Sequence, residues 1–381
     1  MGLMMPLTQN KLGDKMKPKK FPKESISLKD EKTGNEITQL TSDKSIHHHP
    51  FFHVNSYNSD QDKLFFISHR SNLPQIMFAD MDSLHLFQIS DLENLNEWSI
   101  NPSLDGKYIY YTAAFSGWRV EVDTGREEKI IDFQADQMME KGMVAAAMGT
   151  TCLSNSGKWW GVTCKVAEKS RFIIINTENG ESTTILEGES ISHMQFCPDD
   201  DEQIFYAGPL TDRVWTIRRD GSGNQRVYEK KPLEWITHES WLPKTKEIAF
   251  VDWPNGMRAV NIDTKKERQL TNFNAWHAIS NHAGKRIIAD TNFPDIGLQI
   301  FDPFDENFEH ETICLPNSSS VGEHWNGPFP YGKGPIKVYA PQNTHPHPRF
   351  SPDDRKVVYT SDCSGFSQIY EVSIPNHHWS S

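Results

Sequence analysis

The sequence predicts an all-β fold, a seven-bladed β-propeller closed by an N-terminal strand that completes the last blade. Three observations predict it. A unit of short β-rich strands and turns recurs seven times, with turns about 40 to 50 residues apart, the period of four-stranded blades. The last unit ends after its third strand. A similar strand stands by itself near the N-terminus.

The first element is a leader over residues 1–22, which we expect to be disordered. It has few apolar residues before it turns basic, and it lacks the h-region and cleavage site of a secretory signal. No apolar run approaches the length of a membrane span. The sequence therefore predicts a cytoplasmic protein without a membrane partner, with residues 23–381 forming a single propeller domain.

The second element is the stray strand NEITQLT, from Asn35 to Thr41. It matches the segment ERQLTNF, which closes the fifth unit, almost letter for letter. The seventh unit stops after SQIYEVSIP and has no outer strand of its own. We expect the N-terminal strand to fill that position, because closing the ring removes the exposed sheet edges.

The seven units follow in order, each with a turn and strand segments such as KYIYYTA, KEIAFVD and RKVVYTS. The clearest copy runs from His345 to Val372. The units open at His49, Trp98, Thr150, His193, His238, His277 and His345.

Two segments interrupt the repeat. Phe133 to Met148 is the one helix candidate, a short helix between blades. Residues 302–343 form a Pro- and Gly-rich insert before the last blade, and we expect an ordered loop on one face. The insert contains His324, to which the sequence assigns no role.

The charge and the cysteines limit the function classes. A net charge of −12 argues against a partner that is a nucleic acid or an anionic membrane. An anionic small substrate remains possible, provided that local cations or a metal hold it. The five cysteines are scattered without a CxxC pair, so we expect free thiols in a reducing compartment.

Histidines recur at the start of the units, where the innermost strand of each blade begins. Because these positions converge at the centre of a propeller, five of seven blades bring a histidine to one place. A single such histidine is more often a core or surface residue, but the set in matching register indicates a functional cluster. Neutral imidazoles suit a divalent transition metal. The residues in this register are His48, His49, His193, His238, His277, His345 and His347.

The HPHP motif supplies the densest part of the cluster. His345 and His347 lie at i and i+2, on the same face of an extended strand, and the prolines restrict the backbone. Gln342 can add an amide oxygen and His277 a third imidazole. This set without Cys or carboxylate suits Mn²⁺, and Zn²⁺ or Fe²⁺ remain alternatives; a structural zinc site would be closed and tetrahedral.

Two residues beside this set are candidates for acid–base and electrostatic roles. His238 has the same register one blade before His277 and is a candidate general base. Arg213 lies on a later strand of the preceding blade. On residue type alone, a surface salt bridge is an equal alternative for Arg213.

The chain resembles the oligogalacturonate lyases, pectin-degrading propellers, over almost its whole length after the leader. The resemblance is strongest in THESW around His238, in HAISN from His277, and in QNTHPHPRFSPDD from Gln342. It implies a β-elimination dependent on Mn²⁺, with the uronate carboxylate of an anionic oligosaccharide on the metal. The metal ligands are then His277, Gln342, His345 and His347. His238 is the Brønsted base, and Arg213 neutralises or positions the uronate.

The remaining candidates, His48, His193 and Arg70, are assigned to substrate binding. His49 stands where members of the family tend to carry arginine, which leaves open a lyase for another uronate-containing oligosaccharide. A metal-dependent hydrolase or epimerase and a non-enzymatic TolB-like binding propeller are further alternatives. A Ser-His-Asp hydrolase is disfavoured, because the sequence has no G-x-S-x-G elbow. The sequence assigns no oligomeric state.

Overall fold

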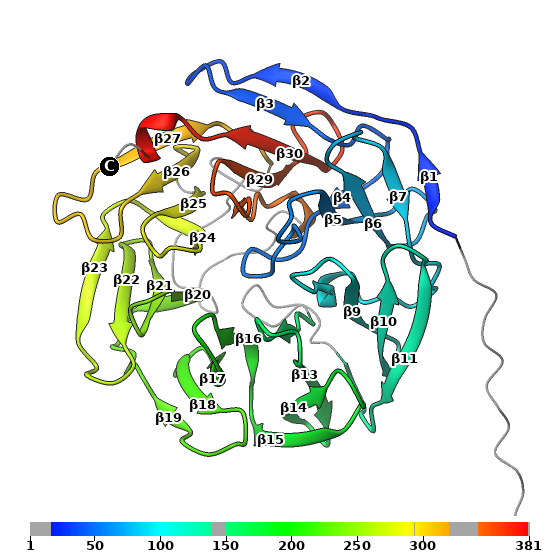
Figure 1. Ribbon diagram of the computed structural model, residues 1–381. Coiled ribbons are helices and arrows are strands. Elements are labelled where there is room, and N and C mark those ends of the chain that lie inside the picture. Colours follow the sequence, from blue (N-terminus) through cyan, green and yellow to red (C-terminus); the bar gives the residue numbers. More distant parts are fainter. Residues whose placement is uncertain (1–16, 139–148, 293, 320–341, 380–381) are drawn as a thin grey trace, which may run out of the picture.

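The computed structural model describes residues 17–138, 149–292, 294–319 and 342–379. Seven antiparallel sheets stand radially around a common centre and form one ring (Figure 1). The predicted seven-bladed β-propeller is thereby confirmed. The blades are numbered along the chain, and the strands of each are given from the centre outward.

Blades one to four follow each other around the ring. Blade one contains β4 (His47–His48), β5 (Lys63–Ser68), β6 (Gln75–Asp80), β7 (Leu86–Gln88) and β1 (Lys19–Phe21). Blade two contains β8 (Asn101–Pro102), β9 (Tyr108–Ala113), β10 (Ser116–Glu121) and β11 (Arg126–Asp132). Blade three contains β12 (Cys152–Leu153), β13 (Trp159–Val166), β14 (Lys169–Asn176) and β15 (Ser182–Gly188). Blade four contains β16 (Ser192–Cys197), β17 (Asp200–Ala207), β18 (Val214–Arg218) and β19 (Gln225–Arg226).

Blades five to seven complete the ring. Blade five contains β20 (Trp235–Leu242), β21 (Glu247–Trp253), β22 (Gly256–Asn261) and β23 (Glu267–Thr271). Blade six contains β24 (Ala275–Ser280), β25 (Ile287–Thr291), β26 (Leu298–Phe301) and β27 (His310–Cys314). Blade seven contains β28 (Arg349–Phe350), β29 (Lys356–Ser361), β30 (Gln368–Ser373), β3 (Glu36–Gln39) and β2 (Ile26–Lys29). The described residues also form short 3₁₀ turns, η1 (Glu97–Ser99), η3 (Gln342–Thr344) and η4 (Asn376–Trp379).

The ring closes as the sequence predicts, through the N-terminal strand. β3 runs antiparallel to β30, and β2 adds a fifth strand outside it. The Thr41 hydroxyl donates to Oε1 of Gln368 at 2.6 Å and accepts the backbone N–H of Ile369 at 3.0 Å. The N-terminal strands β2 and β3 and the C-terminal strands β28 to β30 therefore share blade seven (Figure 1).

The described part of the leader is ordered, which corrects its predicted boundary at residue 22. Lys19–Phe21 pair with β7 as an outer strand of blade one. The physical reason is a specific contact: the Arg70 guanidinium lies 4.6 Å from the centre of the Phe21 ring. Arg70 also forms an ion pair with Glu24 at 2.9 Å. Residues 1–16 lie outside the described residues.

The two predicted interruptions also differ from expectation. His310–Cys314, inside the predicted insert of residues 302–343, form β27 and complete blade six. Residues 320–341, with His324, lie outside the described residues. The described start of the helix candidate, residues 133–138, contains no helix; Gln137 forms a β-bridge with Lys165. Residues 139–148 lie outside the description.

The hydrophobic core lies between neighbouring blades. Seven clusters of buried side chains fill the seven interfaces, one cluster to each. Between blades one and two, for example, Phe65 and Ile67 meet Ile109 and Tyr111. Because both faces of the middle strands are covered, these strands are apolar almost throughout. Each fully buried large side chain contributes about 1.5 to 3 kcal/mol to stability.

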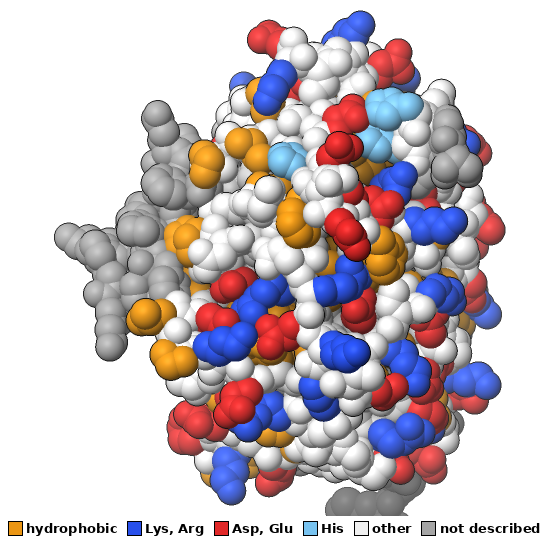
Figure 2. All heavy atoms as spheres, turned by 90° about the vertical axis from the view of Figure 1, so that its left-hand side faces the viewer, with side chains coloured by type: hydrophobic (Ala, Val, Ile, Leu, Met, Phe, Trp, Pro, Cys, Tyr) orange, Lys and Arg blue, Asp and Glu red, His pale blue; other side chains and the backbone are white. Residues whose placement is uncertain are grey.

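The outer edge of the ring carries both signs of charge. Figure 2 shows acidic and basic side chains interspersed over the side where blades five and six lie. Ion pairs there include Arg268 with Glu247 at 2.7 Å and Lys246 with Asp263 at 2.9 Å. No helix among the described residues is long and apolar enough to cross a bilayer. All five cysteines are free, as predicted.

Candidate active site

The innermost strands of blades four, five and six carry histidines at β-bulges. The pairing of β16, β20 and β24 with the next strand shifts at His193, His238 and His277 respectively. His193 and His238 have φ of 48° and 49°, in the left-handed region that side chains with a Cβ seldom adopt. A bulge turns the local side chain away from the regular alternation, and bulges are common beside active sites.

The predicted metal set is brought together in part by the described structure. His277, His345 and His347 are all buried, and each offers a ring nitrogen within 4.8 Å of the others. The rings of His277 and His347 have their centres 4.0 Å apart. Gln342 lies in η3, immediately before this group, and its backbone carbonyl contacts Nε2 of His347 at 3.2 Å.

The hydrogen bonds of two of these histidines leave a nitrogen for a metal. Nδ1 of His277 bonds Oδ2 of Asp290 at 2.8 Å, so its proton lies there and Nε2 keeps a lone pair. The bond of His347 Nε2 to the Gln342 carbonyl leaves the lone pair on Nδ1. Both lone-pair nitrogens are buried and have no hydrogen-bond partner among the described residues. This donor set fits a divalent transition metal.

Asp290 is a site residue that sequence reasoning missed. It lies on β25 and is buried. Besides the ring of His277, it accepts the backbone N–H of His277 at 2.6 Å and that of His347 at 3.2 Å. One carboxylate therefore fixes the orientation of one candidate ligand and the backbone of another, a common partner for histidine ligands.

His238 lies beside the candidate metal set. Its ring centre is 4.3 Å from that of His277, and the Trp276 ring packs edge-on against it at 4.5 Å. Nδ1 has no hydrogen-bond partner within the described part of the chain. Burial lowers the pKa of His238 well below its usual value, and the charges of His277 and His193 lower it further. The imidazole is therefore neutral and keeps a lone pair, and the lowered pKa makes it a weaker base than a free imidazole.

Arg213 is buried, which excludes the surface salt bridge considered from its residue type. Its Nε and Nη2 bond the two oxygens of Glu239 at 2.7 and 3.0 Å, and Nη2 also contacts Nδ1 of His193 at 3.1 Å. Burial opposes ionisation of Glu239, but the Arg213 charge and His193 outweigh it and bring its pKa to about 2. Arg213, Glu239 and His193 thus form one ionic group next to His238.

A second cluster, His48 with His69 and Glu97, lies on blades one and two. Oε2 of Glu97 is 3.2 Å from Nε2 of His48 and 2.6 Å from Nε2 of His69. Burial would raise the pKa of Glu97, but hydrogen bonds from the two histidines hold it well below the usual range. His48 also stacks on Trp98 with ring centres 4.1 Å apart. The centres of the Trp98 and His347 rings are 5.7 Å apart, so this cluster adjoins the metal set.

Two aromatic residues fill the space between the histidines. Phe51 and Phe52 follow β4 and are buried. The Phe51 ring lies within 4.8 to 6.4 Å of the rings of His347, His193, His277 and His238. His49 is also buried and bonds Ser56 at 3.0 Å and the Pro346 carbonyl at 3.2 Å. Burial lowers the pKa of His49 to about 3.

Arg70, predicted to contact substrate, has other partners in the described structure. It pairs with Glu24, stacks on Phe21 and contacts Nε2 of His47 at 3.1 Å. These contacts hold the N-terminal segment against blade one.

Fold and site together define a class of protein: a β-propeller with a buried histidine centre suited to proton transfer and metal binding. The family model for oligogalacturonate lyase matches residues 15–378. The chain belongs to the oligogalacturonate lyase family and is a carbon–oxygen lyase.

Individual relatives agree with this assignment. The oligogalacturonate lyase of Dickeya dadantii is 28% identical over 388 residues, covering 95% of this chain and 99% of the relative. The oligogalacturonide lyase of Pectobacterium atrosepticum is 26% identical with the same coverage. A solved oligogalacturonate lyase in complex with manganese superposes with a TM-score of 0.80 at 23% identity, covering 95% and 99% of the two chains. The Vibrio parahaemolyticus oligogalacturonate lyase gives a TM-score of 0.77 at 20% identity, covering 95% and 100%.

Proposed function

We propose that this chain cleaves oligogalacturonate by a metal-dependent β-elimination in which His238 removes the C5 proton. The observation that carries the proposal is the pair of buried lone-pair nitrogens, on His277 and His347, beside a neutral His238. Family membership supports the lyase chemistry. The proposal adds the residues and their roles, and a cytoplasmic location remains a prediction.

The proposed metal ligands are His277, His345, His347 and Gln342. Mn²⁺ is the preferred ion, because a relative has been solved with manganese and the donor set lacks thiolate. When bound, the ion supplies a Lewis acid next to the uronate carboxylate. Asp290 keeps the proton of His277 on Nδ1, so that Nε2 stays available to the metal.

The proton transfer is assigned to His238. A uronate bears its acidic C5 hydrogen next to the carboxylate, and a neutral base approaches it without charge repulsion. His238 accepts this proton, the C4–oxygen bond breaks, and a C4–C5 double bond forms. The departing oxygen takes a proton from solvent. A well-placed general base contributes about 10² to 10⁴-fold to the rate.

Arg213 is proposed to supply positive charge beside the reacting uronate. Its bidentate contact with Glu239 fixes the guanidinium, so no reorganisation is needed when charge develops on the substrate. His193 and His48 are proposed as substrate contacts. The His193 ring lies beside that of His238, and His48 stacks on Trp98, which adjoins His347. Arg70 would have to leave Glu24 in order to join them.

The test measures ultraviolet absorbance of the new double bond on digalacturonate, together with the metal content of each variant. We expect His238→Ala to lose at least 10²-fold in rate while retaining metal, and His345→Ala to lose both. His310→Ala, at an exposed histidine of β27, should behave like the wild type. Full activity of His238→Ala would refute the base assignment. Cleavage of other uronate oligosaccharides, but not of digalacturonate, would select the alternative substrate.

A further inference from the structure

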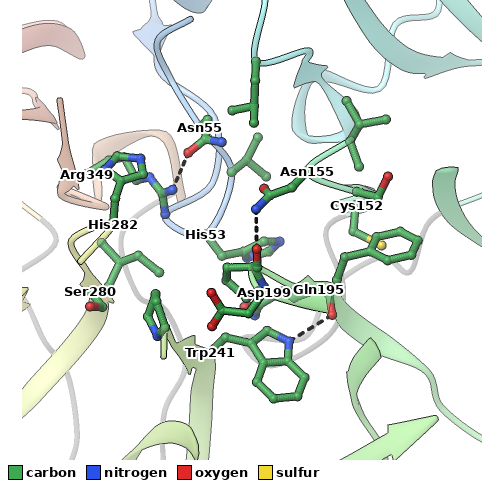
Figure 3. A pocket seen from close by; sticks show the side chains of 18 of the residues that line it. His53, Asn55, Cys152, Asn155, Gln195, Asp199, Trp241, Ser280, His282 and Arg349 are labelled. Carbon is green, nitrogen blue, oxygen red and sulfur yellow. Dashed lines mark hydrogen bonds between the residues drawn. The ribbon is translucent and has the colours of Figure 1, made fainter. Parts of the chain in front are cut away.

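A cavity of about 250 Å³ lies at the opposite ends of the inner strands from the histidine cluster. The histidines lie in the first half of β16, β20 and β24, whereas the cavity is lined by the ends of these strands and the turns after them. Its walls come from all blades of the ring, and Figure 3 shows Arg349, Asn55, Asn155 and His282 around the space. We call it the lower cavity.

Phe51 and Phe52 separate the lower cavity from the candidate active site. Their rings pack against His193, His238, His277 and His347 on one side. His53, the next residue, lines the lower cavity and touches both phenylalanine rings edge-on at 5.3 and 5.4 Å. A ligand in the lower cavity therefore has no direct contact with the proposed metal ligands.

Arg349 gives the lower cavity its positive charge. Its guanidinium donates to Oδ1 of Asn55 and to the Phe52 carbonyl at 3.4 Å, and it forms no ion pair with a carboxylate of the described residues. Burial lowers the pKa of Arg349 to about 10, so the group is charged at neutral pH. The nearby Asp354 is engaged elsewhere, by Asn281 at 2.9 Å and by His282 at 3.3 Å.

The other charged groups in the cavity wall cancel each other. Asp199 accepts the backbone N–H of Lys244 at 2.7 Å and also pairs with its ammonium group. His53 is neutral, because burial holds its pKa well below the usual value. Neither of its ring nitrogens has a hydrogen-bond partner within the described chain. Among the described residues, the wall thus offers one uncompensated cation, Arg349, and several amides.

We propose that the lower cavity binds a small hydroxycarboxylate of about one sugar ring, with the carboxylate on Arg349 and the hydroxyls on the amide side chains of the wall. Guanidinium binds carboxylate in a bidentate, charge-assisted contact. The volume lies just below the roughly 300 to 1,000 Å³ of pockets for drug-sized ligands, which favours a single sugar ring over an oligosaccharide. This site does not depend on the proposed elimination.

The test is isothermal titration calorimetry of the full chain with D-galacturonate and with D-galactose, which has the same hydroxyls without the carboxylate. We expect galacturonate to bind at least tenfold more tightly than galactose. His345→Ala, which disables the other end of the ring, should leave this affinity unchanged. Loss of binding in His345→Ala, or no binding to the wild type at millimolar galacturonate, would overturn the proposal.

Asn55→Asp is the sharpest variant, because it is nearly isosteric and supplies Arg349 with an internal carboxylate. It should weaken galacturonate binding at least tenfold without lowering the melting temperature. Arg349→Gln removes the charge while keeping a donor for Asn55, and it should have the same effect on affinity. Wild-type affinity in either folded variant would show that Arg349 does not hold the carboxylate.

Discussion

Within the described structure, the Asp290 carboxylate directs its hydrogen bonds to two of the histidines proposed as metal ligands. It accepts from Nδ1 of His277 and from the backbone N–H groups of His277 and His347. A carboxylate in this position raises the basicity of the imidazole and fixes its orientation. The tautomer of His277, and with it the availability of Nε2, therefore depends on one residue that need not touch the metal.

We expect Asp290→Asn to weaken metal binding about 10- to 100-fold, the usual cost of losing such a partner. The amide keeps the shape but is a weaker acceptor, and its N–H₂ group can face the ring. Titration of Mn²⁺ into metal-free protein measures the effect. Asp302→Asn, at a surface ion pair with Arg286, is the matched control. An unchanged affinity in Asp290→Asn would contradict the role of this carboxylate.

The residues found from the sequence and those missed differ in a physical way. His193, His238, His277 and His345 share one position in a repeating unit, so their convergence follows from the fold class alone. Glu239 and Asp290 do not share that position. Glu239 joins the site because the bulge in β20 spans both His238 and Glu239. Asp290 joins it through a neighbouring strand, and such pairing is not visible before the strands are aligned.

Among the secondary-structure elements, β3 was predictable because its amino-acid sequence resembles that of the closing strand of the fifth unit. β1 was not, because KKF contains little β signal and depends on Phe21 meeting Arg70. β27 was missed for a similar reason. Its sequence HETIC has one apolar pair, and only its place beside β26 makes it a strand. The outer strands of a blade show a weaker hydrophobic pattern because they lie at the solvent-exposed edge of the sheet.

We expect deletion of residues 2–41, which removes β1, β2 and β3, to lower the melting temperature and promote aggregation. Without β3, the backbone of β30 becomes an exposed sheet edge, and exposed edges pair with other chains. Thermal unfolding and light scattering measure the two effects. Deletion of residues 2–16 leaves all described strands intact and should change neither. Equal behaviour of the two deletions would show that closure contributes little.

At the scale of the whole molecule, the ring brings many neutral histidines into its buried interior. His47 and His49 have pKa values near 4 and 3, lowered chiefly by burial, and those of His53, His193, His238 and His347 are also lowered. This arrangement suits a metal and a base, which both need unprotonated nitrogen. It also makes the stability of the propeller depend on pH.

The sign of this dependence follows from His47, which lies away from the proposed metal ligands and is fully buried. Above pH 6.5 it is neutral in both the folded and the unfolded chain. Between pH 6.5 and about 4 the unfolded chain takes up a proton that the folded chain does not, so stability falls as the pH falls. Each such histidine lowers the free energy of unfolding by at most about 1.4 kcal/mol per pH unit.

We therefore expect the free energy of unfolding in urea to decrease from pH 7 to pH 5. His47→Gln should flatten this slope, because glutamine keeps an acceptor for Arg70 and cannot take up a proton in this range. His310→Gln, at an exposed position on β27, should keep the wild-type slope. If His47→Gln and the wild type lost stability equally over this interval, burial of neutral His47 would not be a source of the acid sensitivity.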